Sequence, residues 1–289
     1  MKQSLLEKIS IYLLKKGYTI KSLTRTCFDV VARKEGQILL IKVLEDANSI
    51  SEEFASEMKR ISSYIAASPI VVSEKAGNKL ENGIVYSRFG VYTLNYSTFI
   101  NCVDNRMPFI KRDHAGLTAH VLGDRLKRKR EDEGISLASL SKKVGVSRKM
   151  IQRYEKGEAD VTVSKAFKLY DLFGGSVFEK IDIFGAEKEE KQEPKSDIAK
   201  KYSELGFEAL ETKKVPFDVI AKREKEIILT DIGDKTRPGL KPLSKLIDAD
   251  SLVIFNQKKP KDIAAMTKEE FLEYEKAKEL IKFLKEFEK

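Results

Sequence analysis

The stretch LGDRLKRKREDEGISLASLSKKVGVSRKMIQRYEKG, residues 122–157, decides how the rest of this chain is interpreted. Its apolar residues recur at the three- and four-residue intervals of amphipathic helices. These residues are Leu137, Leu140 and Val144, followed by Ile151 and Tyr154. Lysine and arginine are frequent at the positions between them. The spacing predicts two short helices that share a small core and turn a basic face outward.

The turn between these two helices is also specified by the sequence. Gly145 supplies the left-handed or tight backbone position that a sharp turn needs. Val146 fills the corner, and the hydroxyl of Ser147 can cap the second helix. Ser136 starts the first helix in the same way, and Gly134 ends a preceding helix predicted over residues 119–133. Three helices are therefore delimited.

Taken together, Leu-Gly-x-Arg, Gly-Ile-Ser, Leu-Ala-Ser-Leu, Gly-Val-Ser and Ile-x-x-Tyr-Glu-x-Gly resemble the helix-turn-helix of Cro and phage-repressor (XRE) type regulators, over residues 117–183. In that family the second helix of the motif enters the major groove, where its N-terminal residues contact base edges. Arg and Lys suit guanine, and Gln suits adenine. The resemblance implies that bases are read by Ser147, Arg148, Lys149, Gln152 and Arg153. Leu137 departs from the family pattern, because many members place a Gln there that touches the DNA backbone.

Positive charge is concentrated around this motif. The formal net charge of the chain is +9, and residues 106–168 hold 16 Lys and Arg against 8 Asp and Glu. Short basic helices are usually only solvated faces, but localised basic charge beside this motif favours binding to a polyanion. Phosphate contacts position a DNA-binding module without reading its sequence. The candidates for such contacts are Lys127, Arg128, Lys129, Arg130, Lys142, Lys143 and Lys156.

The length and composition of the chain allow two or three domains. It has 289 residues, of which 42% are hydrophobic and 34% are charged. No apolar run approaches 18 residues and no signal-peptide pattern is present, so we expect a cytoplasmic protein. Cys27 and Cys102 lie far apart, without His or Cys at ligand spacing. We therefore expect no disulfide framework and no structural zinc. His114 and His120, the only histidines, also lack Cys or carboxylate partners at ligand spacing, and no nucleotide fingerprint is present, so we expect no metal at these residues and no cofactor.

The chain contains an internal repeat. Residues 17–46 align without a gap on residues 206–235, and Phe-Asp-Val at 28–30 matches Phe-Asp-Val at 217–219. Farther on, residues 61–73 align with residues 243–255, so seven residues are lost between the strand pair and the next helix, where a loop deletion is expected. Two copies of one α/β unit thus flank the helix-turn-helix, and the second ends in a helix predicted over residues 268–287. We also expect the copies to pack together as a pseudo-symmetric pair.

Each copy resembles the restriction-endonuclease-like fold, and most closely that of archaeal Holliday junction resolvases. In those enzymes an Asp, and a Glu-x-Lys thirteen residues later, bind a divalent metal and orient water. The corresponding residues here are Asp29, Lys42 and Leu44 in the first copy, and Asp218, Asp231 and Gly233 in the second. The first copy has lost the metal ligands. The second keeps two carboxylates without the Lys, so weak metal binding by this copy stays open. We expect no catalysis, and interpret Asp29 and Asp218 as hydrogen-bonding residues at a strand turn.

The predicted fold is α/β plus all-α, with two repeated restriction-endonuclease-like domains flanking a lambda-repressor-like helical DNA-binding domain. The predicted domain ranges are 1–105, 117–185 and 195–289, with linkers over residues 103–118 and 186–196.

This arrangement resembles a family of archaeal helix-turn-helix transcriptional regulators. It favours a non-enzymatic regulator that reads double-stranded DNA as a homodimer, because one reader contacts only a few base pairs. Two alternatives stay open. One is a structure-selective nucleic-acid binder or nuclease tethered by the helix-turn-helix, and the other is a coactivator that bridges to the basal transcription machinery.

Overall fold

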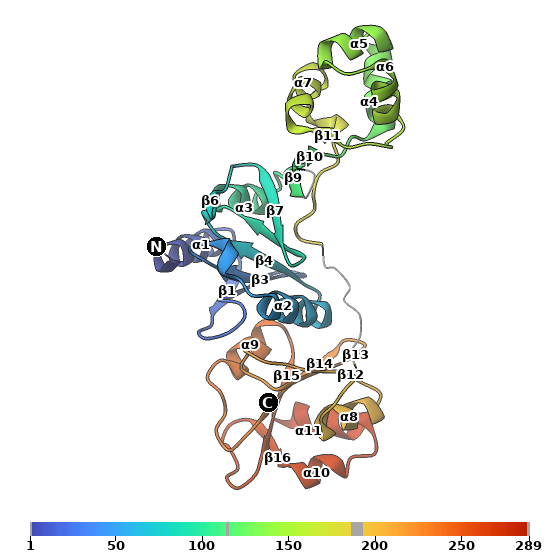
Figure 1. The fold of residues 1–289 in the computed structure, drawn as a ribbon. Coiled ribbons are helices and arrows are strands. Elements are labelled where there is room, and N and C mark those ends of the chain that lie inside the picture. Colours follow the sequence, from blue (N-terminus) through green and yellow to red (C-terminus); the bar gives the residue numbers. More distant parts are fainter. Residues whose placement is uncertain (1, 114–115, 186–192, 288–289) are drawn as a thin grey trace. The chain divides into compact units, whose positions relative to one another are not determined.

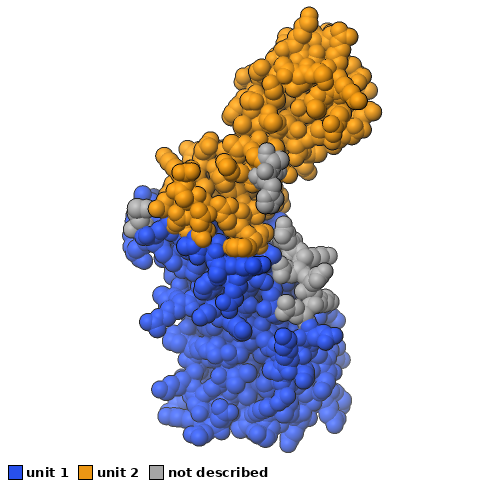
Figure 2. Space-filling view, in the orientation of Figure 1, with its two compact units in different colours: residues 1–45, 49–71, 184–289 blue, residues 46–48, 72–183 orange. Residues whose placement is uncertain are grey.

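The computed structural model describes residues 2–113, 116–185 and 193–287, and its helices and strands are shown in Figure 1. The chain divides into two compact units, which Figure 2 distinguishes by colour. Unit 1 comprises residues 1–45, 49–71 and 184–289, and unit 2 comprises residues 46–48 and 72–183. The charged segment predicted as a linker, residues 186–196, lies mostly outside the described residues.

The first copy of the repeat begins unit 1. Its strands β1, β2 and β3 form an antiparallel meander, and β4 is the next neighbour of β3 in the order β1-β2-β3-β4. The elements are α1 (Lys2–Lys15), β1 (Thr19–Ser22), β2 (Val30–Lys34), β3 (Gln37–Val43), η1 (Ala47–Ser49), α2 (Glu52–Ile65) and β4 (Ala67–Val72).

The second copy has the same beginning and a five-stranded sheet of order β12-β13-β14-β15-β16. Strands β12 to β14 pair antiparallel, whereas β14, β15 and β16 are parallel. The elements are α8 (Asp197–Glu204), β12 (Glu208–Glu211), β13 (Val219–Arg223), β14 (Glu226–Ile232), α9 (Leu240–Leu246), β15 (Asp250–Phe255), β16 (Ala264–Thr267), α10 (Lys268–Leu272) and α11 (Ala277–Glu286).

The internal repeat is confirmed by these boundaries. Strands β12, β13 and β14 begin and end 189 residues after β1, β2 and β3. The deleted residues, however, are not in a loop as expected. Helix α2 has 14 residues and its counterpart α9 has 7, while residues 44–51 and 233–239 are loops of similar length. The second copy therefore lacks about two turns of the helix, and the strands on either side of this helix keep their counterparts in the first copy.

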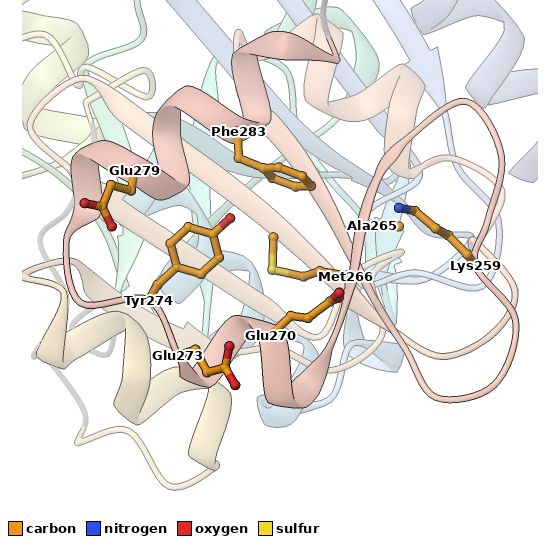
Figure 3. Close-up of a pocket in the computed structure, with 8 residues that line it drawn as sticks. All are labelled: Lys259, Ala265, Met266, Glu270, Glu273, Tyr274, Glu279 and Phe283. Carbon is orange, nitrogen blue, oxygen red and sulfur yellow. The ribbon is translucent and has the colours of Figure 1, made fainter.

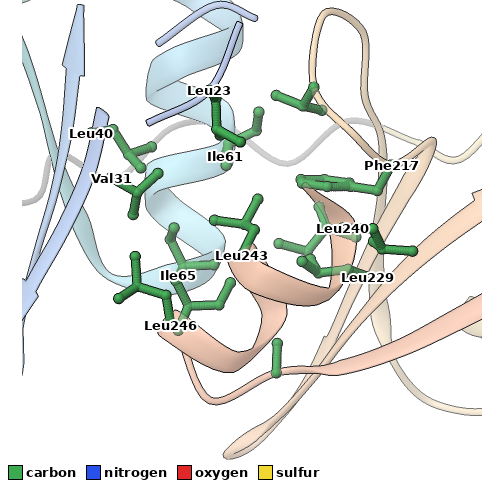
Figure 4. Close-up of a cluster of buried hydrophobic side chains, with 14 of the residues drawn as sticks. Leu23, Val31, Leu40, Ile61, Ile65, Phe217, Leu229, Leu240, Leu243 and Leu246 are labelled. Carbon is green, nitrogen blue, oxygen red and sulfur yellow. The ribbon is translucent and has the colours of Figure 1, made fainter. Parts of the chain in front are cut away.

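The two copies share one hydrophobic core within unit 1 (Figure 4). Equivalent residues of both copies point into it, because strand side chains alternate between the two faces of a sheet. The aligned pairs are Phe28 with Phe217, Val31 with Ile220, and Leu40 with Leu229 from the strands, and Met58 with Leu240 and Ile61 with Leu243 from α2 and α9. The expected pseudo-symmetric packing of the copies is thus present in the structure.

The helix predicted over residues 268–287 is wrong, because the chain breaks between α10 and α11. Phe271, Ala277 and Leu280 all pack into the core on the other face of the second sheet. In one straight helix, 100° per residue would turn Ala277 and Leu280 away from the side of Phe271. The break at residues 273–276 lets both short helices face the same sheet.

Unit 2 contains a sheet segment and a helical part. Its strands have the order β8-β7-β9-β10-β11, in which only β7 and β9 are parallel. The elements up to the helical part are β5 (Lys75–Ala76), β6 (Asn78–Lys79), β7 (Ile84–Arg88), β8 (Val91–Leu94), α3 (Tyr96–Val103), β9 (Ile110–Asp113) and β10 (Gly116–Ala119). The segment predicted as a linker, residues 103–118, therefore contains paired strands.

The helical part contains the predicted helix-turn-helix. Its elements are α4 (Gly123–Asp132), α5 (Leu137–Val144), α6 (Arg148–Glu155), β11 (Val161–Thr162), α7 (Val163–Phe173) and η2 (Gly175–Val177). Helix α4 begins at Gly123 and not at residue 119 as predicted, because Ala119 belongs to β10 and pairs with Val161. A single core of buried side chains from all four helices holds this part together, including Leu126, Leu140, Ile151 and Leu169.

Cys27 and Cys102 are buried free thiols, and burial raises the pKa of Cys102 to about 12 and that of Cys27 still higher. Both sulfurs therefore remain protonated at neutral pH.

Among residues 2–113, 116–185 and 193–287, no helix combines the length and apolar character that a membrane span requires.

Candidate nucleic-acid interface

Local hydrogen bonds shape the helix-turn-helix. Helix α5 ends at Gly145, whose backbone is left-handed with φ 78° and ψ 48° and whose N–H donates to the carbonyl of Ser141. Two residues later the side chain of Ser147 accepts a hydrogen bond from the backbone N–H of Met150, at 3.1 Å, and so caps α6. Ser136 caps α5 in the same way through the N–H of Ser139. These caps fix where each helix begins.

Helix α6 turns one face into the core and the other to solvent. Ile151 is fully buried and Tyr154 is 5% exposed. The five residues predicted to read bases are all exposed: Ser147, Arg148, Lys149, Gln152 and Arg153. Among them, Ser147 is engaged by its capping bond, and Arg153 donates to the carbonyl of Glu158 at 3.4 Å. Helix α6 thus presents two arginines, a lysine and an amide on one rigid, accessible face.

Six of the seven residues predicted to contact phosphate are exposed, namely Lys127, Arg128, Lys129, Lys142, Lys143 and Lys156. Lys142 and Lys143 lie in the last turn of α5, where positive charge also stabilises the negative end of the helix dipole. Lys156 lies just after α6, with its ammonium 3.9 Å from the carboxylate of Glu158.

Arg130 does not fit the predicted phosphate role. It is buried, and its guanidinium donates to both carboxylate oxygens of Glu155, the longer bond being 3.1 Å, and to the carbonyl of Ile135. Because α4 places residues 126 and 130 on one face, Arg130 follows the buried Leu126 into the domain. It joins α4 to α6 and is a structural residue.

Two lysines that the sequence analysis missed lie beside the turn of the motif. Lys168 on α7 donates to the carbonyl of Val144 at 3.2 Å, at the C-terminus of α5. A Cβ placed on Gly145 would lie 3.3 Å from the Lys165 ammonium and 3.4 Å from that of Lys168. The signal in the sequence was their three-residue spacing on an amphipathic helix. Both ammonium groups add positive charge next to the turn.

In the first copy of the repeat, lysines surround the acidic position. One oxygen of Asp29 accepts the backbone N–H of Val43 at 2.8 Å. The other lies 3.0 Å from the ammonium of Lys2 and 3.4 Å from that of Lys42. Leu44 follows where the enzymes carry their Lys. The hydrogen-bonding role expected for Asp29 is present, and a divalent metal does not fit beside two ammonium groups.

The second copy uses an arginine in the same place. One oxygen of Asp218 accepts the backbone N–H of Ile232 at 2.8 Å, the counterpart of the bond between Asp29 and Val43. Its other oxygen lies 2.6 Å from Arg237, whose Nε lies 3.3 Å from the buried carboxylate of Asp231. Gly233, with φ 148°, has no side chain to contribute. Arg237 was missed because it belongs to the loop after the strand. Within the described residues, no group of three His, Cys, Asp or Glu side chains is arranged to hold a metal.

A separate cavity of about 380 Å³ opens on the second copy (Figure 3). Figure 3 shows Met266 between Tyr274 on one side and Lys259 on the other, and the lining also includes Glu270, Glu273 and Glu279. Burial, followed by the negative charges of Glu270 and Glu279, raises the pKa of the Tyr274 phenol. The negative surroundings make this cavity unsuited to a phosphate.

Comparison with known proteins identifies the class of protein first. A family model described as a PD-(D/E)XK superfamily domain matches residues 2–108, and one described as a helix-turn-helix matches residues 126–180. Both matches confirm the resemblances found in the sequence and the predicted fold class.

Relatives of similar length narrow this class to one family. A protein of Archaeoglobus fulgidus is 31% identical over 99% of this chain and 98% of its own length. One of Methanocaldococcus jannaschii is 31% identical over 92% of this chain and 90% of its own, and one of Pyrococcus abyssi is 34% identical over 72% and 70%. Each carries the name "Putative HTH-type transcriptional regulatory protein". The chain belongs to this family, as the sequence resemblance indicated.

Proposed function

We propose that this protein is a DNA-binding transcriptional regulator that reads sequence in the major groove through α6. One observation carries the proposal: Arg148, Lys149 and Gln152 are exposed on a helix whose opposite face is buried. Such a helix holds hydrogen-bonding side chains in fixed positions, as base recognition requires. The names of the relatives, and the localised positive charge of residues 106–168, support the same conclusion.

The remaining parts have supporting roles in this proposal. The exposed lysines and arginines of α4 and α5 contact phosphates, and Lys165 and Lys168 join them from α7. The nuclease-like copies, residues 1–105 and 195–289, act without catalysis and supply dimerisation or backbone contacts. The functional protein is a homodimer on double-stranded DNA, because two readers one helical turn apart give the specificity that one cannot.

The test is selection of bound sequences from a random DNA pool with the full chain, followed by binding at several salt concentrations. We expect a palindromic consensus. The double variant Arg148→Ala/Gln152→Ala should lose about 2–6 kcal/mol of preference for that consensus over unrelated DNA, since each good base contact contributes about 1–3 kcal/mol. The control Lys129→Ala should weaken binding to all sequences equally and reduce the salt slope by about 1.

Other outcomes would favour the alternatives. Binding without enrichment, which only falls steeply with salt, would contradict sequence reading and favour structure-selective binding. Low DNA affinity that rises with a transcription-machinery partner would favour a bridging factor. Magnesium-dependent nicking of plasmid or branched DNA, abolished in Asp218→Ala, would show an active nuclease.

A further inference from the structure

We propose that Arg237 is a tethered cation that replaces the divalent metal of the nuclease-like fold in the second copy, and that its removal opens a metal site formed by Asp218 and Asp231. The proposal is independent of what α6 binds. The structure and the fold family disagree at this position, because a side chain from a loop lies where the family places an ion.

Every carboxylate oxygen at this position already has a partner. The Oδ1 atom of Asp218 lies 2.6 Å from Nη2 of Arg237, and the Oδ1 atom of Asp231 lies 3.3 Å from Nε of the same guanidinium. The two Oδ2 atoms accept backbone N–H groups at 2.8 Å, from Ile232 for Asp218 and from Arg237 itself for Asp231. A metal ion needs at least some of these oxygens as ligands.

Burial explains why a cation is needed here. Asp231 is 1% exposed, and an isolated carboxylate at such a position would be costly to keep ionised. Nuclease-like proteins meet this demand with a metal. Here one guanidinium bridges both carboxylates and supplies the counter-charge from within the chain.

In the first copy, different residues supply the positive charge beside the equivalent aspartate, Asp29. Asp29 also has one oxygen on a backbone N–H, that of Val43, and its other oxygen near side-chain cations, Lys2 and Lys42. Lys42 is on β3 and Lys2 is on α1, whereas Arg237 is in the loop before α9. Because the cations come from unrelated positions of the repeat, the shared feature is the charge at this place and not a shared residue.

The loop geometry makes Arg237 replaceable without loss of the fold. Its side chain is 40% exposed, and its backbone N–H, which holds Asp231, is present in any non-proline variant. Arg237→Ala therefore removes the cation and keeps the backbone hydrogen bond from residue 237 to Asp231. The two carboxylates with bound water then form the kind of site that Mg²⁺ or Mn²⁺ accepts.

The experiment is titration of the full chain with Mn²⁺, with free Mn²⁺ followed by electron paramagnetic resonance. We expect Arg237→Ala to bind one more Mn²⁺ per chain than the unmodified protein does. The double variant Arg237→Ala/Asp231→Asn should lose that site. The control Lys268→Ala, which breaks an exposed ion pair with Asp197 in the same copy, should gain none.

Two results would overturn the proposal. In the first, the unmodified protein binds Mn²⁺ at Asp218 and Asp231 as tightly as the Arg237→Ala variant does, and Asp231→Asn abolishes this binding. The other is a folded Arg237→Ala chain, judged by circular dichroism, that binds no additional Mn²⁺. If Arg237→Ala does not fold, Arg237→Gln carries the test, since it removes the charge and the reach to Asp218 but keeps a polar side chain that can donate to Asp231.

Discussion

Lys127, Arg128, Lys129 and Arg130 follow one another in the sequence, yet only Arg130 turns inward. The helix decides this, because Arg130 lies one turn after the buried Leu126. Its partner Glu155 comes from α6, 25 residues later. Arg130 is therefore a structural residue, and only Lys127, Arg128 and Lys129 remain as candidates for the proposed contacts with phosphate.

Arg130→Ala should lower the free energy of unfolding of the helical part. Breaking a buried ion pair by removing one partner costs about 3–5 kcal/mol, because the other charge stays buried without compensation. We expect faster hydrogen exchange at the amides of α4, α5 and α6, and a lower melting temperature for this part.

Arg128→Ala is the matched control on the same helix. Arg128 is exposed, so its replacement should change stability by no more than about 0.5 kcal/mol. It should instead weaken binding to every DNA sequence. Equal stability of the two variants would contradict the structural role of Arg130.

At the scale of elements, the start of α4 lies very close to the end of α6. A Cβ on Gly123 would lie 2.3 Å from the backbone carbonyl oxygen of Glu155 and 2.8 Å from the backbone nitrogen of Gly157. Gly123→Ala must therefore push α4 and α6 apart, at a cost of about 1–3 kcal/mol. We expect a lower melting temperature, and also weaker DNA binding, because α6 carries the residues that we propose to read bases.

Gly36→Ala is the control for the change from glycine to alanine. Gly36 lies in the turn between β2 and β3, where an added Cβ has no neighbour within 4 Å. We expect no loss of stability there. A Gly123→Ala chain as stable as Gly36→Ala would show that α4 and α6 can separate freely.

The elements that sequence could predict are those fixed by local chemistry. Ser136, Gly145 and Ser147 set the ends of α5 and α6 through bonds to residues three or four positions away, so their spacing alone located the turn. The break between α10 and α11 contains neither proline nor glycine, and follows from the position of a sheet formed elsewhere. Arg237 could not be assigned for the same reason, because its role depends on where its loop lies against Asp218 and Asp231.

At the scale of the whole molecule, one buried acid links the two copies and makes their packing depend on pH. Glu57 on α2 is 6% exposed and accepts the backbone N–H of Lys213 from the second copy. Burial raises the pKa of Glu57, although that bond and the guanidinium of Arg60 oppose the shift. A carboxyl whose pKa is higher in the folded protein than in the unfolded chain stabilises the fold most at low pH. This contribution to the free energy of unfolding is lost as pH rises from the unfolded-state pKa through the folded-state pKa.

Glu57→Gln should therefore raise the melting temperature of unit 1 at pH 7 to 8, because the amide keeps the bond from Lys213 without a buried charge. The difference from the unmodified protein should narrow below pH 5 and close near pH 3, because an unfolded Glu, with a pKa of about 4.3, is fully protonated only well below that value. Circular dichroism melts across this range measure it. Glu52→Gln, in the first turn of the same helix and exposed, should show no such gain, and a gain for Glu57→Gln that persists at pH 3 would contradict the explanation.

The shared core has a consequence for protein synthesis. Val31, Leu40 and Ile61 leave the ribosome some 180 residues before Ile220, Leu229 and Leu243, which cover them. At about 5–20 residues per second, the nascent first copy waits roughly 10 to 40 s with this apolar face uncovered. The helices of the helix-turn-helix lie close together in sequence, so we expect this part to fold within that interval. We therefore expect the helix-turn-helix to fold while the first copy still exposes an apolar surface of the kind that chaperones bind.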